Sequence, residues 1–186
     1  MNKSIGERVS IGGRNVKNKE RWMFLGFLLF ICICFASEIK LAEPLEVLRP
    51  LVNKQWVGGF VDPVSRKTCE NIQRFEAIWG GTVIKYTYSI SDINTFAEGY
   101  FYWNRETKQL EAFILHSSSV VQRGVVTLEE GVITLKGSMV FPDRTFEFRN
   151  TFEFKDENTM IDRWFQNAFG SWRAGHVVTL TARNEK

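Results

Sequence analysis

The sequence predicts an all-β fold: a closed, antiparallel up-and-down β-barrel of about ten strands, preceded by a short helix. Segments in which apolar and polar residues alternate follow one another along most of the chain. Aromatic residues are abundant, with 16 Phe, 6 Trp and 4 Tyr, and they favour pleated, half-buried surfaces. The connections are short and polar, so sequential strands pair, and closing the sheet removes its exposed edges. A sandwich with Greek-key connections is the alternative architecture.

The N-terminal region predicts a signal peptide rather than part of the fold. Residues 22–36, WMFLGFLLFICICFA, carry no charge and follow a basic segment, residues 1–21. A membrane-spanning helix takes about 20 apolar residues, so this run suits the h-region of a signal peptide with residues 1–21 as its n-region. We expect cleavage after Ala36 and export of a barrel domain, residues 37–186, to the periplasm or the exterior. An uncleaved membrane anchor is the alternative.

The net positive charge of the chain comes from its first 21 residues. Of the net +3, residues 1–21 hold six basic and two acidic residues, a charge of +4, which leaves 18 basic and 19 acidic residues, or −1, for the remainder. Nucleic-acid binding needs clustered Lys and Arg to displace counterions. We therefore expect no nucleic-acid partner, and membrane contact only through an uncleaved signal segment.

The elements begin with a helical pattern and then change to period two. Residues 43–52 have apolar residues at helical spacing, interrupted by Pro50, which predicts a short helix that closes one end of the barrel. The first strand, Gln55–Val61, contains Gly58 and Gly59, which mark a bend or bulge. The later predicted strands are Asn71–Trp79, Thr82–Ser91, Thr95–Asn104, Gln109–Ser117, Val120–Leu128, Gly131–Val140, Arg144–Phe154, Thr159–Ala168 and Trp172–Arg183.

The inward-facing side chains predicted from this alternation are mostly aromatic and aliphatic. A barrel of about ten strands is wide enough to hold a small ligand. The predicted lining could therefore be plain core packing or the wall of a cavity. Its members are Tyr86, Tyr88, Ile133, Leu135, Met139, Phe146, Phe148, Phe152 and Phe154.

Polar residues with inward parity are candidates for orienting a ligand, because burying a polar group without a partner is unfavourable. Asn150 is in phase with the phenylalanines around it. Arg74 and Glu76 share parity with the isoleucines of their strand, which predicts either a structural ion pair near a barrel mouth or a pair that holds the polar end of a ligand.

The two histidines both fall on predicted strands, His176 inside the barrel and His116 at a barrel rim. His176 shares its face with Val178 and Leu180, which places it inside, and His116 ends a strand. An inward imidazole is either a hydrogen-bonded rim residue or a ligand for a metal or haem iron. No clustered His, Cys and acidic set predicts a metal site.

Signatures of catalysis are missing from the sequence. It contains no Gly-x-Ser-x-Gly elbow, no phosphate-binding glycine loop and no His-Glu-x-x-His. Cys69 is the one cysteine after the signal segment, so the mature domain has no internal disulfide, and nothing near Cys69 predicts a reactive thiolate.

Several segments resemble known barrel families. Gln55–Phe60, QWVGGF, resembles the Trp-x-Gly entry into the first strand of lipocalin and calycin-type barrels. The segments 101–104, 110–118, 124–136 and 172–181 follow in an order similar to exported bacterial calycin-like proteins and to the ten-stranded, nitrobindin-like haem-binding barrels. The resemblance spans about Leu45 to Arg183 and implies a calycin-like barrel.

The resemblance to nitrobindin-like proteins also implies an iron ligand. In that family a histidine on the last strand holds haem iron, and His176 in GHVVTL falls at the matching position, while His116 lies where the family has another histidine-bearing strand end. The family's Tyr-Pro-Thr-like segment after the first strand is replaced here by FVDPV, residues 60–64.

These observations favour an exported, non-catalytic barrel that binds a small apolar or amphipathic ligand and needs no cofactor. The predicted ligand-binding residues are Arg74, Glu76, Tyr86, Tyr88, Phe146, Phe148, Asn150 and His176. The alternatives are haem binding through His176, a filled barrel that serves as an interaction module of the cell envelope, and a small enzyme acting on a bound lipid, with His176 or Glu76 as acid or base.

Overall fold

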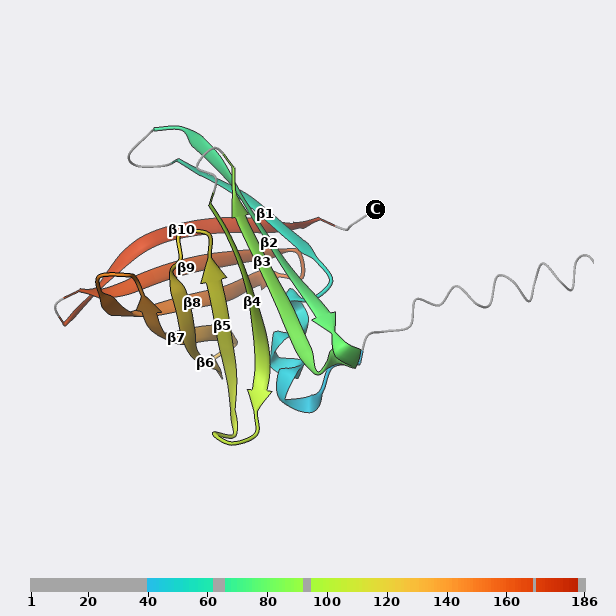
Figure 1. Cartoon of the computed structure of the whole chain (residues 1–186). Helices are drawn as coiled ribbons and strands as arrows, with labels where there is room; N and C mark the ends of the chain where they lie inside the picture. The colour runs from blue at the N-terminus through green and yellow to red at the C-terminus, as the bar shows by residue number, and fades with distance from the viewer. Residues whose placement is uncertain (1–39, 62–65, 92–94, 169, 184–186) are drawn as a thin grey trace, which may run out of the picture. The chain divides into compact units, whose positions relative to one another are not determined.

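The computed structural model describes residues 40–61, 66–91, 95–168 and 170–183. Within these ranges the chain forms a closed barrel of ten antiparallel strands, in which each strand pairs with the next and the last pairs with the first (Figure 1). The predicted fold class is therefore confirmed. The predicted signal peptide, residues 1–36, lies outside the described residues.

The strands lie close to their predicted positions. β2 starts at Thr68 rather than Asn71, and β8 runs to Asp156 rather than Phe154. The elements are η1 (Glu43–Leu51), β1 (Gln55–Val61), β2 (Thr68–Ile78), η2 (Trp79–Gly81), β3 (Val83–Ile90), β4 (Thr95–Asn104), β5 (Gln109–His116), β6 (Val121–Glu129), β7 (Val132–Val140), β8 (Thr145–Asp156), β9 (Thr159–Ala168) and β10 (Ser171–Arg183).

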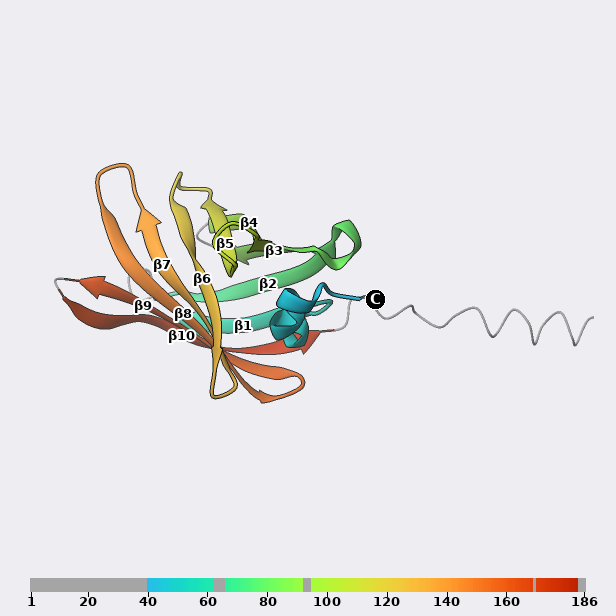
Figure 2. The same cartoon turned by 90° about the horizontal axis from the view of Figure 1, so that it is seen from below.

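The predicted short helix is a 3₁₀ helix, η1, at one end of the barrel (Figure 2). Its apolar face, Leu45, Leu48 and Leu51, is fully buried. Trp56 on β1 is also fully buried, and its indole Nε1 donates a hydrogen bond of 3.0 Å to the Leu51 carbonyl. Just before η1, the Ala42 amide donates to the carbonyl of Gly81 at 2.9 Å. These contacts hold η1 against the end of the barrel where β2 turns into β3.

In the half of the barrel next to η1, aromatic side chains fill the interior. Phe75 on β2 lies with its ring centroid 4.8 Å from that of Tyr86 and 5.9 Å from those of Phe101 and Phe152. Phe148 on β8 is fully buried as well. Much of the predicted inward-facing set is therefore core in this half of the barrel.

The predicted facing of β2 is wrong. Its odd-numbered residues point inward, so Asn71, Gln73 and Phe75 are buried, whereas Arg74 and Glu76 are exposed on the outer face. The prediction failed because the isoleucines of this strand suggested the opposite phase. The interior accepts polar residues here because Gln73 donates a hydrogen bond to a buried carboxylate on another strand, Asp162.

Of the predicted bend or bulge at Gly58 and Gly59, the pairing with β2 shows no bulge, because its register is continuous from Gln55 to Val61. The structure gives Gly58 another role. A Cβ atom at this position would lie 2.3 Å from the Thr179 carbonyl oxygen and 2.8 Å from Leu180 Cδ2. Gly58 is therefore required where β1 and β10 approach closely.

Among the described residues, none of the helices has the length and apolar character needed to cross a membrane.

Replacing Gly58 by alanine should destabilise the barrel by about 1–3 kcal/mol, because the added methyl group overpacks the interface between β1 and β10. Gly59→Ala is a matched control, since its Cβ would meet nothing closer than 3.8 Å. Urea denaturation of both variants would measure the difference. Equal free energies of unfolding for the two variants would refute the packing argument.

Candidate functional site

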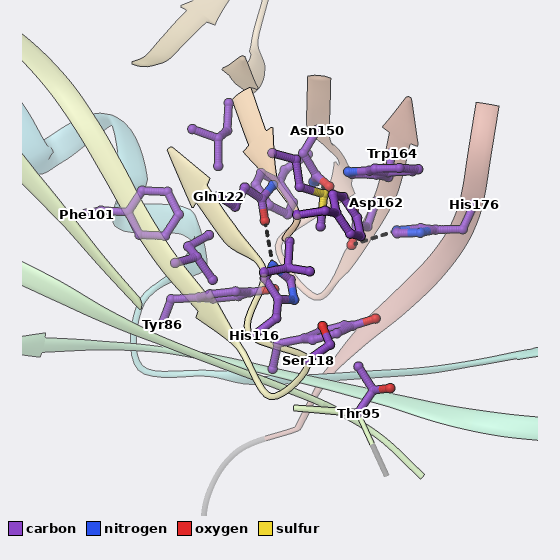
Figure 3. Close-up of a pocket in the computed structure, with 17 residues that line it drawn as sticks. Tyr86, Thr95, Phe101, His116, Ser118, Gln122, Asn150, Asp162, Trp164 and His176 are labelled. Atoms are coloured by element: carbon purple, nitrogen blue, oxygen red, sulfur yellow. Dashed lines mark hydrogen bonds and ion pairs between the residues drawn. The ribbon is translucent and has the colours of Figure 1, made fainter. Parts of the chain in front are cut away.

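The half of the barrel away from η1 contains a cavity of about 300 Å³ (Figure 3). Thr95, Ser118 and Phe141, which lie in or beside the connections β3–β4, β5–β6 and β7–β8, contribute to its wall. Because successive hairpins alternate between the two ends of an up-and-down barrel, these connections lie opposite the end that η1 covers. The remaining lining residues are Tyr86, Tyr88, Phe101, Ile114, His116, Val120, Gln122, Leu135, Met139, Asn150, Phe152, Asp162, Trp164 and His176.

Asp162 on β9 is the polar centre of this cavity. Its side chain faces inward between Met160 and Trp164, and the residue is only 3% exposed. Gln73 Nε2 on β2 donates to Asp162 Oδ2 at 2.6 Å, and Asn150 Nδ2 on β8 donates to Oδ1 at 2.8 Å. Two amides from different strands thus hold the carboxylate in one orientation. Figure 3 shows Asn150, Asp162 and His176 in the cavity.

His176 lies beside this carboxylate. The register of β10 against β9 shifts between Ala174 and His176, and the imidazole stacks on the Trp164 indole, with centroids 6.1 Å apart and planes 12° apart. A Cβ on Gly175 would lie 2.1 Å from Trp164 Cε3, so the glycine lets the indole lie against the backbone. His176 Nε2 is 3.8 Å from Asp162 Oδ2, too far for a hydrogen bond, and it is buried without a hydrogen-bond partner.

Tyr86 and Tyr88 form the wall contributed by β3. Their rings stack with centroids 6.4 Å apart. Burial raises the pKa of both phenols well above the ordinary value of 10, and the negative charge of Asp162 raises it further. Both side chains therefore stay neutral at physiological pH.

His116 lies at the open end of the cavity, where a rim position was predicted. Its Nε2 is 3.1 Å from Gln122 Oε1, a contact that requires the proton on Nε2. Burial lowers the pKa of His116 below 6.5, and the hydrogen bond with Gln122 opposes this shift only in part. His116 is therefore neutral at pH 7.

The structure places the predicted ligand-binding residues in three environments. Tyr86, Tyr88, Asn150 and His176 line the cavity. Phe148 belongs to the core, and Phe146 packs between Phe141 and Trp164, with ring centroids 5.1 and 6.2 Å away. Arg74 and Glu76 lie outside the barrel, across from Thr87 and Lys85 of β3, so they cannot orient a ligand in the interior.

Sequence reasoning missed Asp162 and Trp164. A signal was present, because both share parity with Met160 on a predicted strand. An aspartate in an inward position is informative because carboxylates are almost never fully buried without partners. One partner, Asn150, comes from the neighbouring strand β8, and the other, Gln73, comes from β2 far away in the sequence, where the wrong facing assigned to the strand hid it.

The arrangement does not fit haem iron held by His176. The iron-bound nitrogen of a haem ligand needs open space for the wide, flat macrocycle. His176 Nε2 instead faces Asp162, which two hydrogen bonds fix in place. Ligation would require the imidazole to turn away from Asp162. In the part of the chain that the structure describes, no three His, Cys, Asp or Glu side chains gather into a metal site.

The lowered pKa of His116 predicts how stability depends on pH. Below pH 6.5 the unfolded chain takes up a proton at His116 more readily than the folded protein, so the free energy of unfolding falls as the pH falls from 6.5 toward the folded-state pKa. Above pH 6.5 this residue contributes no pH dependence. His116→Gln should lose less stability than the wild type between pH 7 and pH 5 in thermal denaturation. Parallel pH profiles for the two proteins would refute this assignment.

Comparison with known proteins supports the fold alone. No protein-family model matches the chain, and neither does any curated protein. The crystal structure of Rv2717c from M. tuberculosis is similar, with a TM-score of 0.53 and 17% sequence identity, over 77% of this chain and 99% of that one. At this identity the likeness shows a shared barrel, while the calycin-like and nitrobindin-like assignments stay predictions.

Proposed function

We propose that this protein is a non-catalytic carrier that binds one small apolar or amphipathic molecule inside its barrel. The observation that carries the proposal is the cavity of about 300 Å³, walled mainly by aromatic and aliphatic side chains with a few convergent polar groups. Ligand sites have this composition and range from roughly 300 to 1,000 Å³, so the cavity suits a small ligand.

Two features of the polar groups support binding rather than catalysis. Asp162 is held by two amides, and His176 Nε2 lies 3.8 Å from its Oδ2, too far for a hydrogen bond. Ser118 and His116 both line the cavity, but His116 Nε2 is engaged by Gln122. Cys69 is fully buried and is not among the residues of the cavity wall.

We also propose that the carrier acts outside the cytoplasm. The support is the uncharged run of residues 22–36 after a basic segment, which is typical of an export signal.

Native mass spectrometry of the protein, expressed as the full chain and purified from the compartment where it accumulates, would test both proposals. A bound small molecule, or uptake of one, is the expected result. The mass would also show whether residues 1–36 are removed. The same sample titrated with haemin tests the alternative: a Soret band that disappears in His176→Ala would replace the proposed carrier function by haem binding.

A larger side chain inside the cavity should weaken ligand binding. Met139 on β7 lines the cavity, so Met139→Trp should weaken binding of the neutral fluorophore N-phenyl-1-naphthylamine by at least about tenfold, or 1.4 kcal/mol. Val140→Trp is the matched control, because Val140 is the next residue on the same strand and is exposed. Fluorescence titration gives the affinities. Failure of the wild type to take up the fluorophore, or equal binding by both variants, would contradict an interior site.

A further inference from the structure

We propose that the polar end of the ligand is a protonated amine, bound at the carboxylate of Asp162 beside His176, so that the cavity selects cationic over anionic amphiphiles. This inference rests on the proposed carrier function and names the ligand class of the same site.

The charges on the cavity wall favour a cationic ligand. Asp162 carries the only carboxylate on the wall of the cavity, and no Lys or Arg is among the described residues that line it. The two groups that hydrogen-bond to Asp162, Gln73 and Asn150, are neutral amides. A carboxylate in a low-dielectric interior is unfavourable without a cation nearby. A ligand with an ammonium group would supply that cation, and a ligand with a carboxylate would meet like charge.

Three of the titratable neighbours supply no positive charge to balance it. Tyr86 and Tyr88 stay neutral at physiological pH, and so does His116. His176 faces Asp162 from β10, but its Nε2 makes no hydrogen bond to the carboxylate.

The carboxylate of Asp162 can accept more hydrogen bonds than it receives. Each oxygen of Asp162 accepts one hydrogen bond from an amide, and an ionised carboxylate offers about four acceptor sites. Beside it, Gln73 Oε1 is buried without a partner. An ammonium group has three N–H donors and no acceptor. It therefore suits a place where acceptors are left over.

The aromatic side chains of the cavity wall also favour a cationic ligand. The indole of Trp164 and the rings of Tyr86, Tyr88, Phe101 and Phe152 line the same cavity. The faces of aromatic rings attract cations within about 6 Å, most strongly when both are desolvated. The same rings bury the apolar part of the ligand, so the cavity suits an amine carried on a short hydrocarbon body.

The test compares three probes with the same hydrocarbon chain: octylammonium, 1-octanol and octanoate, titrated calorimetrically into the full-chain product at neutral pH. Octylammonium should bind about tenfold more tightly than 1-octanol, and octanoate should bind most weakly. Asp162→Asn should remove the preference for the amine over the alcohol while leaving the affinity for 1-octanol within about threefold of the wild type. Glu129→Gln removes one negative charge from an exposed position and should leave the preference intact.

The outcomes separate this inference from the carrier function on which it rests. Octanoate or 1-octanol binding as tightly as octylammonium, or an amine preference that survives in Asp162→Asn, would overturn the amine assignment while leaving the carrier function standing. Binding of N-phenyl-1-naphthylamine without any of the three probes would do the same. Absence of binding by all four molecules would overturn both proposals. The order of the three wild-type affinities decides the matter even if Asp162→Asn does not fold.

Discussion

The architecture depends on closure of the sheet by pairing of the first strand with the last. Ten strands enclose a space too wide for the side chains of one small domain to fill at both ends. The chain fills one end with η1, whose three leucines are fully buried, and with a cluster of phenylalanines. At the other end aromatic and aliphatic side chains, two histidines and an aspartate line a hollow instead of filling it. The cavity is thus a consequence of closure combined with a plug at one end.

The polar groups of the hollow belong to the framework as well as to the site. Gln73, Asn150 and Asp162 come from β2, β8 and β9. The Asn150–Asp162 hydrogen bond joins two paired strands, whereas the Gln73–Asp162 hydrogen bond joins two strands that are not neighbours in the sheet. A buried hydrogen bond to an ionised group contributes about 1.5–3 kcal/mol. The same side chains that orient the carboxylate toward a ligand therefore also connect β2 with β9 across the two strands of the closing seam, β1 and β10.

Strand number, order and approximate limits followed from period-two alternation and turn residues, since both are local properties of a sequence. Facing was predictable where one face is clearly apolar, as around Phe148 and Phe152, and failed on β2, where amides point inward and isoleucines outward. The place of Asn150 and His176 in the cavity was predictable from parity. Asp162 was not recognised, because one of its two hydrogen-bond partners, Gln73, lies on a strand far away in the sequence whose facing was predicted wrongly.

The closing seam between β1 and β10 has a consequence for folding. Its register joins only Gln55, Trp56 and Val57 to residues at the very end of the described chain, Arg183, Ala182 and Thr181. Every other strand pair is a local hairpin that can form as soon as its own two strands exist. The seam can form only when both β1 and β10 are present, and its formation costs the entropy of closing a loop that contains all the strands between them. Until the seam forms, the sheet has two free edges, those of β1 and β10, and closure removes both of them.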